Sequence, residues 1–429
     1  MKSIQDRLSR RAQGKAPSPI RELVPLMKLP GMISLGGGYP NPDTFVFARV
    51  EVGFKQGARI VLEGKELVGA SQYGPTDGQP ELVSSLLEWH QKKDGVKLEP
   101  NQLLVLNGSQ EGLFIMPYLF LDDDDTCVVS EPDYSGALGA FASFCKTTPV
   151  SVPLDGQGMD TDALAKVLAD RKAAGQKAPK YIYVVPNGHN PGGVALSLER
   201  RKALVRIAEE HDLLILEDDP YQLVRLDGSN PPPTLQSMAP HRVIRLDSFS
   251  KIFTPGLRVG YVTGPADAVR QFVLFKQSCN LHTSALAQAL LDKFMRTVGH
   301  EGFRAEIRKN CEFYRTNRDA MVAAARKHLP REVRFNVPTE GMFIWFELPA
   351  KCDAKRMIEA DTRKELVIAV PGGAFSTTGG LKNCMRASYS MVTPDQNRRG
   401  HEAPRPDDPV RAAARLSTPS RGVRPHARR

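Results

Sequence analysis

Residues 243–263 read VIRLDSFSKIFTPGLRVGYVT, and this stretch decides the fold. It begins with an apolar strand at 243–246 and ends with another at 259–263. Between the two strands lies Lys251, which is flanked by small hydroxyl residues and followed by Arg258. Polar residues directly after a buried strand are typical of open α/β sheets, in which ligands bind at the carboxyl ends of the strands. The stretch therefore predicts an α/β fold with a ligand site at Lys251.

Similar apolar strands recur on the N-terminal side of this stretch, separated by turns or by helices such as 198–211. Nearly continuous apolar strands that alternate with helices indicate a mostly parallel sheet covered on both faces. The last strand is expected to run antiparallel because its connection is short. The expected strands are 102–107, 126–130, 181–185, 213–216, 243–246 and 259–263.

The pattern changes from about residue 285, where long, charged helices begin. A strand pair around 333–336 and 341–348 and a final alternating strand at 386–390 follow them. This part predicts a smaller α+β domain. The expected division is an N-terminal segment 1–45 that joins the small domain, a large domain 46–289, the small domain 290–396 and a disordered tail 397–429.

The charge of the chain is concentrated at its C-terminal end. Its 58 Lys and Arg against 48 Asp and Glu give a formal net charge of +10, and an excess spread over a folded face would suggest a polyanionic partner. Residues 397–429 alone hold nine arginines, three acidic residues and five prolines. That composition predicts disorder, so the sequence does not favour nucleic acid as a partner of the folded part.

Cysteine usage and the N-terminus bear on the compartment. The six cysteines form no CxxC pair and no close Cys/His cluster, so neither a zinc site nor a disulfide framework is indicated. No apolar run approaches the roughly 20 residues that cross a bilayer. The basic N-terminus lacks the apolar core of a secretory signal, and Asp6 argues against a mitochondrial presequence. We therefore expect a cytoplasmic protein with reduced thiols, no membrane partner and no metal.

Lys251 and the acidic segment 217–221 (EDDPY) suggest a shared chemistry at the sheet edge. A partly desolvated lysine close to Arg258 would have its ammonium form disfavoured, as an imine-forming amine requires. A carboxylate after strand 213–216 can keep a pyridine nitrogen protonated, and Tyr221 can donate to a ring hydroxylate. Each feature alone has an ordinary alternative, a surface lysine or a solvated acidic turn.

Two further segments follow strands in the same way. Segment 186–193 (PNGHNPGG) supplies the amide of Asn190 on a rigid turn. Segment 107–112 (NGSQEG) leads into a helix whose N-terminal amides, with Ser109, make a seat for phosphate. Alone, the first is an ordinary loop and the second an ordinary serine N-cap.

Together these segments resemble, in order and spacing, the fold-type-I pyridoxal-phosphate aminotransferases, and more narrowly the 2-aminoadipate and kynurenine aminotransferase subgroup. The resemblance runs from about residue 17 to 396 and implies a seven-stranded, mostly parallel sheet with helices on both faces, plus a smaller α+β domain. The further motifs that carry it are PSPIR (17–21), ISLGGGYPNPDTF (33–45), QYGPTDGQPEL (72–82), EPDYSG (131–136), GMFIWF (341–346), VPGGAF (370–375) and MRASYS (385–390).

The resemblance implies pyridoxal 5′-phosphate as the cofactor and assigns catalytic roles. Lys251 would form the internal aldimine and then shuttle a proton between the substrate α-carbon and the cofactor. Asp218, three residues before Tyr221, would pair with the pyridinium nitrogen in preference to Asp219. Tyr134 would stack on the ring.

The resemblance also assigns the residues that bind the other polar groups of the cofactor. Asn190 and Tyr221 would bond the ring 3-oxygen. The protein would be a homodimer with an active site shared between subunits. The phosphate would be held by Ser109, Gln110, Ser248, Ser250 and Arg258, and by Tyr73 of the partner subunit.

The substrates implied are an L-amino acid (2-aminoadipate, kynurenine, aromatic or aliphatic) and 2-oxoglutarate, exchanged by a ping-pong mechanism. Arg386 would clamp the substrate α-carboxylate bidentately, beside Asn190. Arg21 would lie on a mobile N-terminal segment and meet a side-chain carboxylate. Gly38 and Tyr39 would line the pocket.

Two alternatives stay open. A β-eliminating lyase, or a synthase acting on an adenosyl-methionine substrate, shares Lys251, Asp218 and Arg386 and differs only in its pocket. A regulator descended from such an enzyme would bind nucleic acid, but it would carry an N-terminal winged-helix domain, for which the residues before Pro17 are too few. His189 and His282 receive no catalytic role, because the mechanism needs only Lys251.

Overall fold

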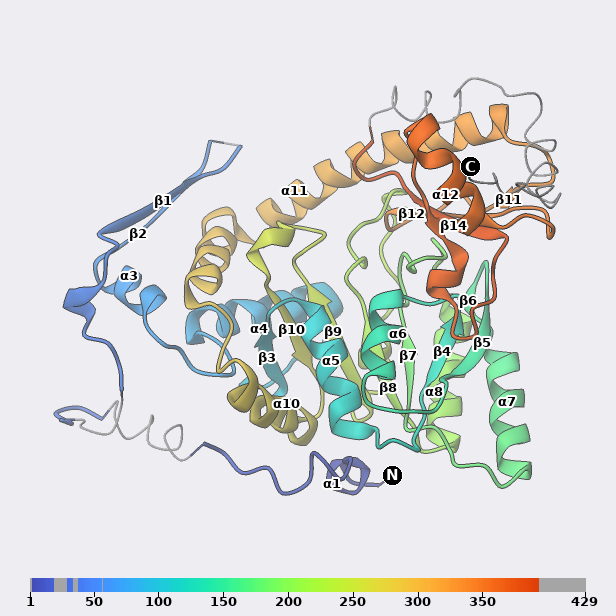
Figure 1. Cartoon of the computed structure of the whole chain (residues 1–429). Coiled ribbons are helices and arrows are strands. Elements are labelled where there is room, and N and C mark those ends of the chain that lie inside the picture. Colours follow the sequence, from blue (N-terminus) through green and yellow to red (C-terminus); the bar gives the residue numbers. More distant parts are fainter. Residues whose placement is uncertain (1, 19–28, 34–37, 56, 393–429) are drawn as a thin grey trace, which may run out of the picture.

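The computed structural model describes residues 2–18, 29–33, 38–55 and 57–392. In this part the chain forms a central eight-stranded sheet, a small four-stranded sheet and a separate two-stranded hairpin (Figure 1). The strands of the central sheet are β3 (Leu103–Leu106), β4 (Val128–Glu131), β5 (Val150–Asp155), β6 (Gly158–Met159), β7 (Tyr181–Val184), β8 (Leu214–Asp218), β9 (Val243–Ser248) and β10 (Gly260–Thr263).

The central sheet is mixed and mostly parallel. Its strand order is β3-β10-β9-β8-β7-β4-β5-β6, with parallel pairing from β9 through to β5. β10 runs antiparallel to both β9 and β3, as its short connection predicts. The expected α/β class is confirmed, and the two-residue strand β6 adds an eighth strand by forming a hairpin with β5.

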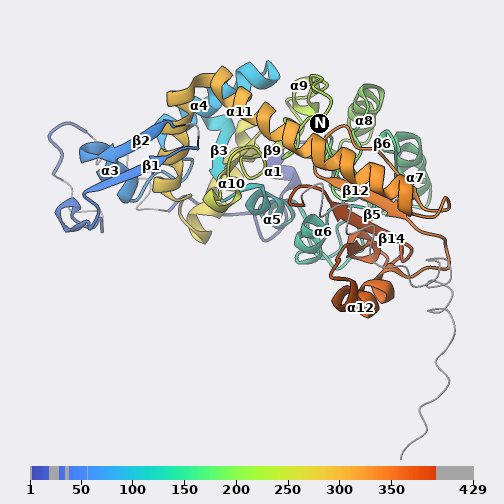
Figure 2. The same cartoon turned by 90° about the horizontal axis from the view of Figure 1, so that it is seen from above.

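Both faces of the central sheet are buried, and β7 shows how. Tyr181 and Tyr183 point into the core cluster that includes α5 and α6, whereas Ile182 and Val184 point into the cluster that includes α7, α8 and α9. Figure 2 shows these two groups of helices on opposite sides of the strands. This double burial is why the strands are continuously apolar. The helices around this sheet are α4 (Pro80–Asp94), α5 (Ser109–Phe120), α6 (Ser135–Ala142), α7 (Thr161–Ala173), α8 (Leu198–Glu210), α9 (Leu235–Met238) and α10 (Ala266–Cys279).

One long helix, α11 (Ala285–His328), connects the central sheet to the small sheet and is kinked at Gly299, where φ is +68°. The second half of α11 packs against the small antiparallel sheet, and Met321 and Val322 share a core with Ile344 and Tyr389. The elements of this part are β11 (Arg334–Phe335), β12 (Phe343–Glu347), α12 (Ala354–Glu365), β13 (Val370–Pro371) and β14 (Cys384–Ser388).

The described start of the N-terminal segment packs through its apolar residues. Its helix α1 (Ile4–Arg7) and the residues after it pack against the large unit: Ile4, Leu8 and Ala12 join the core that contains α5, and Ser9 N donates to the Leu119 carbonyl at 2.7 Å. The described start of segment 1–45 thus contacts the large unit, and the expectation that the segment joins the small domain stays a prediction. The apolar residues spaced at i, i+4 and i+8 are buried by this contact.

The remaining elements lie at the edges of the molecule. The hairpin of β1 (Arg49–Gly53) and β2 (Arg59–Glu63) projects from the body together with α3 (Gly64–Ser71) (Figure 1). The proposed tail 397–429 lies outside the described residues.

No helix in the described part of the chain has the length and apolarity to span a membrane. Short 3₁₀ turns occur at Pro42–Thr44, Pro100–Gln102, Pro255–Leu257 and Gly372–Phe375.

The close approach of α5 to the sheet gives a stability prediction. A Cβ on Gly112 would lie 2.4 Å from Leu246 Cδ2 and 3.0 Å from Leu106 Cδ1. We expect Gly112→Ala to lower the free energy of unfolding by about 1–3 kcal/mol through overpacking, measured by urea denaturation. Gly139→Ala in α6, where a Cβ meets nothing within 4 Å, is the matched control and should gain roughly 0.5–1 kcal/mol. Equal effects in the two variants would contradict this interpretation of the packing.

Candidate active site

The predicted site residues gather where the strands of the central sheet end. Lys251 follows β9, Asp218 ends β8, and Asn190 lies in the loop after β7. Tyr134 is the N-cap of α6, just after β4. Arg386 comes from β14 of the small sheet, and its Nη1 donates to Asn190 Oδ1 at 2.7 Å. Five separate stretches of the sequence therefore converge on one place.

Lys251 lies half buried in the turn after β9. Burial lowers the pKa of its amine, and the positive charges of Arg258 and Arg386 lower it further. The ammonium form is disfavoured for the two reasons that the sequence suggested, desolvation and a neighbouring cation. A larger fraction of the amine is thus free to act as a nucleophile near neutral pH.

Asp218 is a buried carboxylate with one oxygen left over. Tyr183 Oη donates to Asp218 Oδ2 at 3.1 Å, whereas Asp218 Oδ1 is buried and has no hydrogen-bond partner among the described residues. Burial raises the pKa of Asp218 to about 7, and the charges of Asp219 and Asp133 add to this rise. Such a group favours a cationic or proton-donating partner at Oδ1.

The neighbouring Asp219 is already engaged. It accepts from Asn187 Nδ2 at 2.8 Å and lies 3.0 Å from Arg245 Nη2. Asp219 Oδ1 also lacks a hydrogen-bond partner among the described residues, so the two carboxylates differ in the ion pair with Arg245, which is recorded for Asp219 and not for Asp218.

The guanidinium of Arg386 lies against two aromatic rings, and one of its N–H donors has no partner among the described residues. Its guanidinium carbon lies 4.3 Å from the ring centre of Phe343 and 5.0 Å from that of Phe375. Burial lowers the pKa of Arg386, and its buried Nε has no hydrogen-bond partner in the described part of the chain. A guanidinium fixed in this way suits a carboxylate ligand, because the carboxylate would accept a hydrogen bond from the unused donor.

The start of α5 forms an anion seat. Helix α5 begins at Ser109, after Gly108 with φ of +76°. A Cβ on Gly108 would lie 2.3 Å from Arg258 Nη2, so glycine lets the guanidinium approach the helix N-terminus. Arg258, itself in the left-handed region with φ of +57°, donates to the Asn107 carbonyl at 3.0 Å and to Ser250 Oγ at 3.2 Å. Free helix N–H groups, a guanidinium and hydroxyls together match a phosphate group.

The other predicted residues of this group lie beside the seat. Gln110 Oε1 accepts from Tyr134 Oη at 3.1 Å, and Ser248 Oγ accepts from Ser250 N at 3.2 Å. Tyr221 is buried, and its pKa is raised by burial and by the charge of Asp218.

Three predicted residues lie elsewhere, and one is not described. The Tyr39 and Tyr73 rings meet edge to face with centres 6.2 Å apart, and both side chains are exposed. Gly38 is also exposed, and Arg21 lies outside the described residues. Within the described chain, no recorded contact joins Tyr73 to the Lys251 group, so its role at the site remains a prediction that depends on a second subunit.

The histidines left without a catalytic role are held by other groups. His189 Nδ1 accepts from Gly192 N at 3.3 Å, and its Nε2 lies 3.4 Å from Asp133 Oδ1. His282 Nε2 accepts from Gly74 N at 3.3 Å, and its ring contacts Tyr73.

Sequence reasoning missed several residues that shape the site. Tyr183 binds Asp218 from β7, and Phe343 and Phe375 support Arg386. Lys276, fully buried in α10, donates to Glu111 Oε1 at 2.7 Å, and Glu111 in turn accepts from Asn107 N at 2.6 Å. The sequence signal for these residues was indirect. It consisted of a lysine in an apolar helical stretch and of aromatic residues inside strands, and neither pattern indicates which residue is contacted.

Comparison with known proteins identifies the family. The model of "Aminotransferase class I and II" matches residues 51–403. The chain belongs to this family. It is therefore an aminotransferase, and the comparisons do not favour the lyase, synthase or nucleic-acid-binding alternatives.

Individual relatives cover most of the chain. It is 36% identical over 395 residues to the mitochondrial kynurenine/alpha-aminoadipate aminotransferase of Rattus norvegicus, covering 88% of this chain and 92% of that protein. The structure of Pyrococcus horikoshii kynurenine aminotransferase, in complex with PMP, matches with a TM-score of 0.74 and 34% identity over 92% and 96% of the two chains. An alpha-aminoadipate aminotransferase from Thermus thermophilus, complexed with N-(5′-phosphopyridoxyl)-L-leucine, matches with a TM-score of 0.73 and 32% identity over 82% and 86%. These aminotransferase relatives imply pyridoxal phosphate.

The raised pKa of Asp218 predicts how this aminotransferase responds to pH without its ligand. Because the pKa is about 7 in the fold and near 3.8 ordinarily, the folded chain binds this proton more tightly than the unfolded chain does. The ionised carboxylate therefore destabilises the fold increasingly as pH rises from about 4 to about 7. Asp218→Asn removes this titration, so we expect it to stabilise the ligand-free protein by roughly 2–3 kcal/mol more at pH 8 than at pH 5.

Urea denaturation at the two pH values measures this difference. Asp219→Asn is the matched control, because it weakens the pair with Arg245 and should destabilise the protein at both pH values. An Asp218→Asn effect of the same size at pH 5 and pH 8 would contradict the raised pKa.

Proposed function

We propose that this aminotransferase uses pyridoxal 5′-phosphate to move an amino group from an L-amino acid to 2-oxoglutarate in a ping-pong exchange. The observation that carries the proposal is that one site holds both an amine of lowered pKa, Lys251, and a buried carboxylate oxygen, Asp218 Oδ1, that has no hydrogen-bond partner among the described residues. Asp218 would hold a pyridinium N–H of the cofactor at that oxygen, and Lys251 would hold the cofactor through its aldehyde group.

The donors present fit this cofactor. Asn190 and Tyr221 are proposed to bond its ring 3-oxygen, and Tyr134 to stack on the ring. When bound, the cofactor supplies an electron sink for the negative charge that develops at the substrate α-carbon. The phosphate would be held by Ser109, Gln110, Ser248, Ser250 and Arg258, together with Tyr73 of the partner subunit.

The protein's own groups would then orient the substrate and move a proton. Arg386 would hold the α-carboxylate through two parallel hydrogen bonds, which fixes the α-carbon relative to Lys251. Lys251, once free, would accept the proton from that carbon as an unprotonated amine and give it up again as an ammonium. Asp218 would stay ionised, because a cation at Oδ1 lowers its pKa from the value it has alone.

The proposed substrate class is broad. The named relatives act on kynurenine and alpha-aminoadipate, and we propose that this chain accepts long dicarboxylic as well as aromatic, kynurenine-like or aliphatic amino acids. Arg21 would pair with a carboxylate on the substrate side chain. Gly38 and Tyr39 would cover an apolar substrate side chain. An unpaired guanidinium beside an apolar substrate would have to turn into water, because burying a lone charge is costly.

We also propose a cytoplasmic homodimer in which each active site uses both subunits. The exposed Tyr39 and Tyr73 support this assembly, since a second copy would cover large aromatic surfaces that the single chain leaves in water. The domain division at residues 45, 289 and 396 and the dispensable tail belong to the same proposal.

The cofactor assignment is tested by chemical trapping. Borohydride reduction of the purified protein and peptide mapping should recover a phosphopyridoxyl group on Lys251. Lys251→Ala should lower the transamination rate by at least roughly 10²–10⁴, the contribution of the proton transfer alone. Lys92→Met, which removes a half-exposed lysine of α4, is the control and should keep the label at Lys251. A label on any other lysine would overturn the assignment.

The substrate proposal is tested by comparing two arginines. Arg21→Ala should raise KM for 2-aminoadipate roughly 10- to 100-fold, the loss expected for one charge-assisted pair, and leave KM for leucine nearly unchanged. Arg386→Ala should weaken both substrates, because they share the α-carboxylate. Equal losses for the two substrates in Arg21→Ala would contradict the two-mode pocket.

A further inference from the structure

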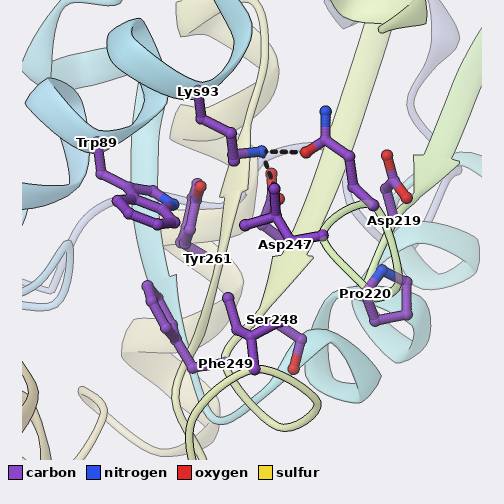
Figure 3. Close-up of a pocket in the computed structure, with 11 residues that line it drawn as sticks. Trp89, Lys93, Asp219, Pro220, Asp247, Ser248, Phe249 and Tyr261 are labelled. Carbon is purple, nitrogen blue, oxygen red and sulfur yellow. Dashed lines mark hydrogen bonds and ion pairs between the residues drawn. The ribbon is translucent and has the colours of Figure 1, made fainter. Parts of the chain in front are cut away.

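A buried network of charged groups lies directly behind the active site. It joins the end of α4 to the carboxyl ends of β8 and β9, and Figure 3 shows part of it around Lys93 and Asp247. Its members are Lys93, Asp94, Glu217, Asp219, Gln222, Arg245 and Asp247.

Lys93 is the link between α4 and the two active-site loops. Its side chain is 2% exposed, and its Nζ lies 2.7 Å from Asp94, 3.0 Å from Asp247 and 2.7 Å from Gln222 Oε1. Gln222 directly follows Tyr221, and Asp247 stands four residues before Lys251. One ammonium therefore bonds to both loops that carry the proposed machinery.

Arg245 is the second cation of the network. It lies 3.0 Å from Glu217, 3.0 Å from Asp219 and 2.9 Å from Asp247. Burial lowers the pKa of the adjacent His90 to about 4, so this imidazole is neutral near pH 7. Two cations thus face four carboxylates, and the network carries an excess of negative charge next to Asp218.

Two carboxylates of the network, Asp94 and Asp247, stay ionised near neutral pH, whereas burial raises the pKa of Glu217. Burial alone would raise the pKa of Asp94 and of Asp247, but Lys93 and Arg245 hold both below their ordinary values. His90, Asp94 and Asp247 have the donor atoms of a metal site, all within 4.8 Å of one another. The Lys93 ammonium already lies against both carboxylates, so the protein supplies its own cation.

The charged side chains of Lys93, Asp94, Arg245 and Asp247 are at most 10% exposed, so the network is almost fully removed from water. The cavity between Lys93, Asp219 and Ser248 has a volume of about 10 Å³, the lower limit for a single water molecule. Charges in such a dry region are weakly screened and act over longer distances than charges at the surface.

We propose that Lys93 and Asp94 are positioning residues that set the proton affinity of the active site from behind the sheet, without touching substrate or cofactor. This inference rests on the proposed function, since it concerns the proton affinity of the cofactor bound at Lys251 and Asp218. The ammonium of Lys93 offsets part of the negative charge behind Asp218, and the carboxylate of Asp94 restores part of it.

The sign of each effect follows from electrostatics. Loss of a positive charge makes every nearby proton harder to remove, and loss of a negative charge makes it easier. The other charged or titratable groups that face Asp218 and Lys251 stay the same in both variants. They are Asp133, Tyr134, Tyr183, Asp219, Tyr221, Asp247, Arg258 and Arg386. The groups around the network that also stay the same are His90, Arg201, Glu217, Arg245 and Tyr261.

The experiment titrates the visible absorption of the cofactor-loaded protein with pH. Lys93→Met should raise the pH midpoint of the absorption change by roughly half a unit or more, and Asp94→Asn should lower it by a similar amount. Both replacements nearly conserve volume, and Asn can still accept from Gln222 Nε2, which now lies 2.7 Å from Asp94 Oδ1. Opposite signs in two neighbouring buried variants separate a charge effect from a packing defect.

Two controls complete the test. Lys92→Met removes a half-exposed lysine from the same turn of α4 and should leave the midpoint unchanged. Lys93→Arg keeps the charge and should also leave it unchanged, even where altered packing lowers the stability. Midpoints unmoved in both Lys93→Met and Asp94→Asn, or moved in the same direction, would overturn the inference. A wild-type protein without the visible absorption would instead contradict the proposed cofactor.

Discussion

Double burial of the central sheet is the constraint on which the rest of the structure depends. Helices cover both faces, so a charged side chain near the carboxyl ends of the strands has little access to water. A buried charge is costly unless it is paired. Arg245 meets this requirement for Glu217, Asp219 and Asp247 at once. Among the described residues, Asp218 Oδ1 and Arg386 Nε are buried at this edge without a hydrogen-bond partner, and in the proposed function a ligand would satisfy both.

Close backbone contacts bring these groups together. Gly188 and Gly341 cross so tightly that a Cβ on Gly188 would lie 2.7 Å from the Gly341 Cα. The buried Glu340 secures the crossing by accepting from Gly188 N at 2.8 Å, and it also pairs with Arg225. The loop after β7 and the small sheet are thereby held in contact. This contact makes the bond between Arg386 and Asn190 possible across the two parts of the molecule.

Much of the fold was predictable because strands that are buried on both faces are rich in apolar residues, which the sequence shows directly. β7, β8 and β9 are buried at every position. β7 reads as an unbroken apolar run, whereas β8 and β9 begin with apolar residues and end in polar ones. β5 was not predicted, since it alternates buried and exposed residues and contains Pro153. The attachment of the N-terminal residues to the large unit was also missed, because the apolar positions of α1 indicate burial but do not name the surface that provides it.

The sequence by itself determined the α/β class, the family resemblance and the placement of Lys251, Asp218 and Asn190 after strands, because parallel strands deliver their carboxyl ends to one edge. Only the tertiary structure decided which groups are paired and which are left free. Tyr183 meets Asp218, Lys276 meets Glu111 and Lys93 bridges two loops across long sequence separations. Pairing, desolvation and the resulting pKa values depend on distances between segments that no local pattern records. The same carboxylates would be ordinary acidic residues in water, and it is their burial beside particular partners that makes them a site.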